Sequence, residues 1–295
     1  MPSAIRRPTL ADVAQLIFVG AIWGGAFIFI TIALTDFGPI SIASWRVTLG
    51  ALVLLAIALL IGQHFPKGWT EWRKITFVGC LNSALPFFLI SWGQQFISSA
   101  ESALLMAMGT FFALIVSHFT SDDERINLPR ASGVAVGFVG VLVLVFWDIQ
   151  ETGLGVLAGQ IAVMLAGCSY AMSSIVSRRL THLPMISTSA ATLLTATVYM
   201  IPIAFLLENP LPTNVSATSL FAMIYLGVIA TALAMTLRFF IIRANGAVFM
   251  SLVGYLVPLF GVLWSALYFA DAVALQTMIA LLLILLGIAI TRKAH

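Results

Sequence analysis

The residues with the clearest capacity for chemistry are polar side chains inside otherwise apolar segments. Arg46 and Asn82 are the two strongest cases. Arg46 is seven residues into its apolar segment, about 10 Å deep if that segment is a membrane helix with a rise of 1.5 Å per residue. A charge at this depth seldom faces lipid, and an amide in hydrocarbon is costly. Both side chains should therefore face the interior. Arg46 would bind a ligand carboxylate or hold helix carbonyls there, and Asn82 would bind a ligand or join two helices.

Seven further residues place polar atoms on apolar segments. As a set they predict a mostly apolar pocket with a few hydrogen-bonding groups, which suits a small molecule. Singly, an aromatic residue in such a segment usually serves packing, and Trp92 has the alternative of anchoring at a membrane interface. The candidate ligand-binding residues are, together with Arg46 and Asn82, Trp23, Trp92, Gln95, Tyr170, Ser173, Ser251 and Tyr255.

Two prolines lie near the centres of apolar segments. Pro86 follows Asn82 by one helical turn, and Pro258 has Gly254 beside it. A proline inside a helix removes one backbone hydrogen bond and clashes with the carbonyl one turn earlier. We expect Pro86, Gly254 and Pro258 to form hinges, with static kinks as the alternative.

The pattern of absent residues argues against catalysis. No acidic residue lies in the middle of an apolar segment, and the segments contain no His-Glu-x-x-His motif or clustered metal ligands. Cys80 and Cys168 are too far apart in the chain to suggest a cluster. We therefore predict no catalytic residue, no metal and no cofactor. Proton coupling through a buried carboxylate is disfavoured, because proton relays in membranes usually need one, and Glu101 is the one weak candidate.

The elements that must position these residues are membrane helices. Hydrophobic residues make up 61% of the 295 residues and charged residues 8%, against about 25% charged in soluble domains. A spanning helix needs about 20 apolar residues. The sequence predicts an all-α polytopic membrane protein with ten such helices, at 12–34, 39–62, 73–97, 99–119, 130–148, 153–177, 184–207, 217–241, 246–269 and 272–291.

Basic residues predict the orientation of these helices. If the N-terminus is cytoplasmic, 12 of the 14 basic residues fall at the cytoplasmic side, and the remaining two, Arg46 and Arg238, lie within helices. Such an excess of Lys and Arg marks the cytoplasmic side. We expect a multi-pass protein of the plasma (inner) membrane with both termini in the cytoplasm. The net charge of +3 is then a topology signal and not a sign of nucleic-acid binding. Arg238 should extend toward the cytoplasmic surface.

The chain also shows an internal repeat. A shift of 147 positions places Ala247 on Ala100, Asp271 on Glu124 and Gly287 on Gly140. We therefore divide the chain into a first five-helix repeat, 1–149, and a second, 150–295. Because each half has an odd number of helices, the two are inverted in the membrane. Inverted repeats favour alternating access to a site between them.

An ordered set of short motifs gives a resemblance to a known family. The motifs are Ile22-Trp23-Gly24-Gly25-Ala26-Phe27, Pro39 with Arg46, Asp123-Glu124, Arg178-Arg179-Leu180, and the run from Tyr255 through Pro258 to Phe260. The chain resembles the EamA-type ten-helix exporters of the drug/metabolite transporter superfamily, and within them the exporters of aromatic amino acids and methionine. The resemblance implies a cavity lined by helices one to four and six to nine, with helices five and ten outside it. Thr110 stands where the family often has proline.

The expected function is export of small amphipathic metabolites, above all amino acids with large apolar or aromatic side chains and methionine, through a weakly charged central cavity. The partners are then the small-molecule substrate and the lipid bilayer. A sugar-phosphate carrier would need several inward-facing cations, whereas Arg46 alone is well placed in the sequence. The alternatives are an exporter of other hydrophobic metabolites or drugs and, from another class, a membrane enzyme or receptor. The sequence has no signal for oligomeric state.

Overall fold

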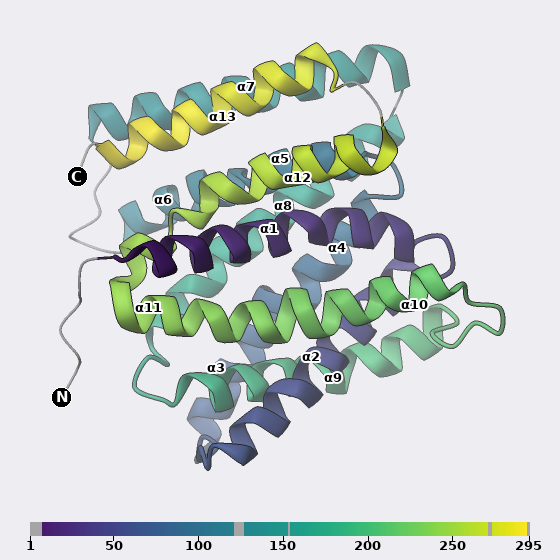
Figure 1. The fold of residues 1–295 in the computed structure, drawn as a ribbon, viewed down its shortest axis with the longest axis vertical. Helices are drawn as coiled ribbons and strands as arrows, with labels where there is room; N and C mark the ends of the chain where they lie inside the picture. The colour runs from purple at the N-terminus through teal and green to yellow at the C-terminus, as the bar shows by residue number, and fades with distance from the viewer. Residues whose placement is uncertain (1–7, 121–126, 153, 271–272, 294–295) are drawn as a thin grey trace.

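The computed structural model describes residues 8–120, 127–152, 154–270 and 273–293. In these ranges the regular structure is entirely helical (Figure 1). Nine helical segments of the described chain are long and apolar enough to cross a membrane, and Leu275–Thr291 forms a shorter apolar helix. The predicted all-α fold with ten membrane helices is confirmed.

The spanning segments follow the chain in order. The first five are α1 (Leu10–Ala33), α2 (Pro39–Leu60), α3 (Trp69–Gly79) with η1 (Cys80–Ala84) and α4 (Leu85–Gly93), α5 (Ser99–Met106) with α6 (Met108–Thr120), and α7 (Leu128–Thr152). The second five are α8 (Leu154–Arg178), α9 (Met185–Leu207), α10 (Ala217–Ile224) with η2 (Tyr225–Leu233) and α11 (Ala234–Met250), α12 (Val253–Phe269), and α13 (Leu275–Lys293). The predicted bounds agree within a few residues, except that the eighth segment continues past 241 to Gly246, where the backbone leaves the helical region at φ 86°.

The chain enters and leaves the bundle at the same end. α1 begins and α13 ends at the left of Figure 1, and we call this the terminal end. Local sequence fixes the start of α1: the Thr9 hydroxyl accepts a hydrogen bond from the backbone of Asp12, whose carboxylate accepts one from the backbone of Thr9. Such a reciprocal capping box satisfies N–H groups that the first helical turn leaves unpaired. The other end, where α1 leads into α2, is called the opposite end.

Two helices are interrupted by π-helical turns at equivalent places. η1 interrupts the third segment at 80–84, and η2 interrupts the eighth at 225–233. Adding the repeat shift of 147 to 80–84 gives 227–231, which lies inside η2. π-helical turns inside α-helices often occur at functional sites. The two halves therefore share a backbone irregularity as well as an order of helices.

The fourth and ninth segments are interrupted as well. Ala107 separates α5 from α6, and its N–H donates to the carbonyl of Leu104, one residue closer than in an α-helix. Ser251 and Leu252 form the corresponding turn between α11 and α12. Four of the segments that surround the centre of the bundle are thus irregular.

The fifth and tenth segments pack against each other at one edge of the bundle. α7 and α13 lie side by side at the top of Figure 1. A Cβ at Gly133 would lie 2.7 Å from the carbonyl oxygen of Gly287, so the absence of side chains permits this close approach. Small residues have this role at helix interfaces in membranes. This pair is positioned to stabilise the bundle from the outside.

Candidate binding cavity

A cavity of about 750 Å³ lies between the two halves of the chain. Its lining comes from segments one to four and six to nine; among the described residues neither α7 nor α13 contributes. Most of the lining is apolar, including Phe27, Phe87, Ile90 and Val257. This is the size and character of a small-molecule pocket.

The cavity extends from the middle of the bundle to the terminal end. Its lining continues to Arg178, Thr181 and Met185, at the connection between α8 and α9. Toward the opposite end it reaches Ile30 and Ile90. The cavity therefore reaches the terminal end, whereas toward the opposite end its lining stops three residues before the ends of α1 and α4.

The opposite end is closed by contacts between the halves. The hydroxyl groups of Ser99 on α5 and Ser265 on α12 are 3.0 Å apart. One turn deeper, a Cβ placed on Gly261 would collide with the Cβ of Ala103. α5 and α12 are thus in close contact here, whereas further toward the terminal end Thr110 on α6 and Gly254 on α12 line the cavity. The fourth and ninth segments meet at one end and diverge toward the other.

Acidic residues at the opposite end also connect the halves. The Glu208 carboxylate accepts hydrogen bonds from the backbone N–H groups of Ile40 and Ser41 at the start of α2, at 3.0 and 2.8 Å. Asp36 accepts from the backbone N–H and the hydroxyl of Ser216, at 2.9 and 2.6 Å, and these bonds lower the pKa of its carboxyl. Glu101 accepts a hydrogen bond of 2.6 Å from Gln160. A carboxylate at a helix N-terminus is favoured by the helix dipole.

Arg46 projects from α2 into the cavity wall. It is 7% exposed, its Nε donates to the Thr231 hydroxyl at 3.2 Å, and its guanidinium carbon lies 3.8 Å from the Phe87 ring centroid. Thr231 in η2 donates in turn to the Leu226 carbonyl, five residues earlier. The π-helical turn thereby positions the hydroxyl that holds Arg46. Arg46 thus bonds to a neighbouring helix through a hydroxyl and not through a carbonyl, and its side chain lines the cavity. Binding of a ligand carboxylate by Arg46 stays a prediction.

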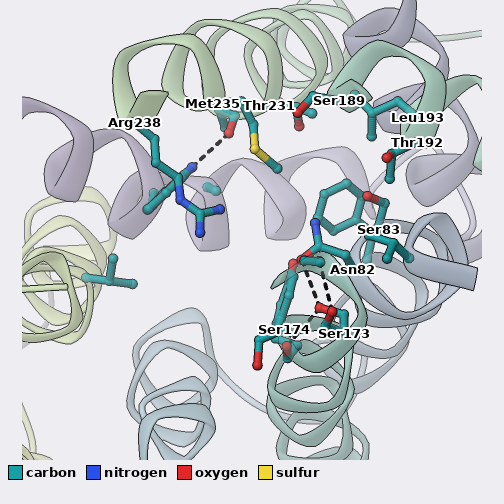
Figure 2. A pocket seen from close by; sticks show the side chains of 18 of the residues that line it. Asn82, Ser83, Ser173, Ser174, Ser189, Thr192, Leu193, Thr231, Met235 and Arg238 are labelled. Atoms are coloured by element: carbon teal, nitrogen blue, oxygen red, sulfur yellow. Dashed lines mark hydrogen bonds between the residues drawn. The ribbon is translucent and has the colours of Figure 1, made fainter. Parts of the chain in front are cut away.

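Asn82, Tyr170 and Ser173 lie together on the facing wall. The Ser173 hydroxyl donates to Asn82 Oδ1 at 3.1 Å and to the Tyr170 carbonyl oxygen at 2.8 Å. Figure 2 shows Ser173 and Asn82 beside each other. Asn82 and Ser83 belong to η1, and Thr231 belongs to η2, so both π-helical turns supply polar residues to the cavity. This places an amide, a phenol and a hydroxyl beside an apolar chamber.

Arg238 is a cavity residue that the sequence analysis did not predict. It lines the cavity on the same face of the eighth segment as Thr231 and Met235 (Figure 2), instead of extending to the surface. The prediction was wrong because it ended the helix at residue 241, whereas the segment continues to Gly246. With the helix ending at Gly246, Arg238 lies about 12 Å from that end at 1.5 Å per residue. This depth is the signal that could have predicted an inward-facing side chain. Arg238 therefore lines the cavity in addition to Arg46 and, at the terminal end, Arg178, so the cavity is more basic than expected.

Trp23 also lines the cavity, but its polar atom serves the fold. The indole Nε1 donates to the carbonyl oxygen of Ala230 at 3.0 Å. Ala230 lies in η2, where the π-helical turn alters the backbone pairing. Trp23 therefore offers the cavity an aromatic surface and no free donor.

Several predicted site residues do not line the cavity. Trp92 packs against the Phe96 ring at 4.9 Å between centroids, and Gln95 is exposed; its neighbour Gln94 is buried and donates to the Phe27 carbonyl. Ser251 is exposed in the turn before α12 and donates to the Val248 carbonyl. Tyr255 packs against the apolar cluster that includes Leu104 and Phe111.

Of the three predicted hinge residues, two line the cavity and one does not. Gly254 and Pro258 line the cavity on the same face of α12, whereas Pro86 is buried outside it. η1 changes the helical phase, so Asn82 shares the cavity face with Phe87, five residues on, and not with Pro86. No group of three or more metal-ligating side chains occurs among the described residues.

Ten membrane helices around a central cavity define a polytopic membrane protein with the architecture of a carrier. The sequence pattern of the EamA-like transporter family matches residues 13–146 and again residues 157–292. The chain belongs to this family, which is part of the drug/metabolite transporter superfamily.

Individual relatives agree with this assignment. The uncharacterized transporter YoaV of Bacillus subtilis (strain 168) is 22% identical over 275 residues, 92% of this chain and 94% of its own. Protein PecM of Dickeya dadantii (strain 3937) is 26% identical over 255 residues, 85% and 82% of the two chains. A crystal structure with 19% identity superposes with a TM-score of 0.70 over 97% of this chain and the whole of the other. That likeness concerns the fold.

Proposed function

We propose that this protein exports small amphipathic metabolites, in the first place amino acids with large apolar or aromatic side chains and methionine, by alternating access. The observation that carries the proposal is the largely apolar 750 Å³ cavity between the two halves, whose lining is divided between apolar side chains and polar ones that include Arg46, Asn82 and Arg238. A ligand with one polar end and one apolar end matches this division. No described acidic side chain lines the cavity, which argues against an organic cation.

The shape of the cavity supports alternating access. The bundle is closed at the opposite end by the contact between α5 and α12 and is hollow toward the terminal end. Because the halves are inverted repeats, exchange of their conformations would close the terminal end and open the other. Pro86, Gly254 and Pro258, together with η1 and η2, are the proposed positions of bending.

The proposed orientation places the terminal end in the cytoplasm and the protein in the plasma (inner) membrane. Arg73, Lys74, Arg178 and Arg243 are near the terminal ends of their segments. Arg6, Arg7 and Arg125, which the orientation argument also used, lie outside the described residues. Lys and Arg collect on the cytoplasmic side of membrane proteins. The hollow end would then receive substrate from the cytoplasm, as export requires.

The test is counterflow in proteoliposomes. Vesicles preloaded with an unlabelled amino acid should accumulate the same labelled amino acid, with phenylalanine, tryptophan and methionine ahead of glycine, lysine and aspartate. Each substrate is measured with and without a proton gradient, which separates facilitated transport from antiport. Absence of counterflow for every amino acid would contradict the proposal and favour the alternative of other hydrophobic metabolites or drugs.

A further inference from the structure

Three arginines line the cavity: Arg178 at the terminal end, and Arg46 and Arg238 further inside on two different segments. Arg46 belongs to α2, and its Nε donates a hydrogen bond to the Thr231 hydroxyl in η2. Arg238 follows Thr231 by seven residues on the eighth segment. Both line the cavity. The hydrogen bond to Thr231 uses Nε of Arg46, so the two terminal guanidinium nitrogens remain for another partner.

Two uncharged groups lie beside these arginines. Tyr170 lines the cavity together with Arg46 and Arg238, and its phenol carries an O–H donor. The Asn82 amide oxygen accepts the Ser173 hydroxyl, which leaves the amide nitrogen as the end of that group available to the cavity. The polar part of the cavity thus offers N–H and O–H donors around a positive centre.

The protein supplies no counter-charge to this centre among its described residues. No described Asp or Glu lines the cavity. A buried cation without a partner is costly, and an ionisable residue inside a membrane protein usually faces a pathway or a ligand. We therefore expect the ligand to supply the negative charge that pairs with Arg46 and Arg238.

We propose that Arg46 and Arg238 form a carboxylate subsite, with Tyr170 and Asn82 as additional donors, and that the carboxylate is the group by which this cavity recognises its ligand. Guanidinium groups bind carboxylates through short charge-assisted hydrogen bonds. The apolar part of the ligand lies against Phe27, Phe87 and neighbouring aliphatic residues. The ammonium group of an amino acid meets no described carboxylate in the cavity and is not required for binding. This inference rests on the proposed function and names the chemistry that its substrates share.

The experiment is a competition assay on the purified full-length protein with labelled L-phenylalanine as probe. Three unlabelled competitors separate the two charged groups: L-phenylalanine, 3-phenylpropionate without the ammonium, and L-phenylalaninamide without the carboxylate. We expect the first two to compete and the amide to compete at least about tenfold more weakly, as loss of a charge-assisted contact implies. Equal competition by the amide, or competition by the amide and not by 3-phenylpropionate, would overturn the subsite.

Variants assign the effect to the two arginines. Arg238→Gln and Arg46→Gln should each weaken phenylalanine binding about ten- to hundredfold, while reducing the discrimination against the amide. Arg238→Lys should restore part of the affinity. Arg243→Gln, an exposed arginine five residues further along the helix and not in the lining, is the matched control and should bind normally.

The possible failures are distinguishable. If phenylalanine shows counterflow but Arg238→Gln and Arg46→Gln both bind it like the unaltered protein, the subsite is wrong and the proposed function stands. If no amino acid binds or shows counterflow, both are wrong. Monodisperse elution and an unchanged melting temperature of each variant in detergent exclude misfolding as the cause of lost binding.

Discussion

The hydroxyl groups of Ser99 and Ser265 lie 3.0 Å apart where α5 and α12 meet at the opposite end of the bundle. These residues belong to different repeats, and the segments that carry them diverge toward the terminal end to form the cavity wall. If transport requires this end to open, the contact must break in every cycle.

A reversible cross-link tests that requirement. In a protein with Cys80→Ser and Cys168→Ser, the pair Ser99→Cys and Ser265→Cys should form a disulfide under oxidation, because the side chains are already in contact. We expect near-complete loss of counterflow on oxidation and recovery on reduction. The single-cysteine variants are the controls and should be insensitive to oxidant. Full transport by the cross-linked protein would mean that this end does not open.

Close packing at the same contact predicts an effect on stability. A methyl group on Gly261 would collide with Ala103, so Gly261→Ala should cost about 1–3 kcal/mol, as overpacking usually does. The matched control is Gly155→Ala, whose new Cβ would lie 3.4 Å from the Phe96 side chain, an ordinary contact. Thermal unfolding in detergent should show a lower melting temperature for the first variant alone. Equal melting temperatures would indicate that α5 and α12 are not tightly packed.

The hydrogen bond between Arg46 and Thr231 predicts a loss of affinity without loss of folding. Thr231→Val keeps the shape of the side chain and removes the acceptor. The loss of one hydrogen bond, about 0.5–1.5 kcal/mol, should weaken phenylalanine binding about two- to twelvefold. Thr236→Val, on the same helix but outside the cavity lining, removes only a bond to the Ala232 carbonyl and should bind normally. The dissociation constants of the two variants decide the matter, and the same weakening in both would remove the special role of Thr231.

Pro86 predicts an effect on rate. It is the second residue after η1 and has no N–H to donate, so an alanine there would favour a regular helix and shift the phase of Asn82. We expect Pro86→Ala to slow turnover more than it weakens binding, and Pro258→Ala to do the same on α12. The maximal rate and the half-saturation concentration of counterflow measure the two effects separately. A change confined to half-saturation would assign both prolines to the binding site and not to a hinge.

Hydropathy and charge predicted the membrane helices because each requires a long apolar run, and the described structure has them at nearly the expected bounds. The sequence predicted less well which face of each helix is buried or lines the cavity. Gln94 and Gln95 are adjacent glutamines, and the end of α4 at Gly93 decides which is buried. Tyr255 follows the Ser251–Leu252 turn, which resets the phase of α12 and directs its side chain away from the cavity.

The polar centre of the cavity was predicted in part. Arg46, Asn82, Tyr170 and Ser173 were found from the cost of polar groups in lipid, and the structure brings them to one cavity. Arg238 was assigned to the surface because the helix end was placed too early. The π-helical turns carry no hydropathy signal, because they arise from backbone pairing and the packing of neighbouring helices.

Substrate protection of a cavity cysteine tests the central claim most directly. Ser189 lines the cavity, and Ser132 is exposed on α7 outside it. In the background with Cys80→Ser and Cys168→Ser, a membrane-impermeant maleimide applied from the terminal end should label both Ser189→Cys and Ser132→Cys. Saturating L-phenylalanine should slow labelling of Ser189→Cys and leave Ser132→Cys unchanged. Equal labelling of Ser189→Cys with and without phenylalanine would contradict the claim that this cavity is the substrate site.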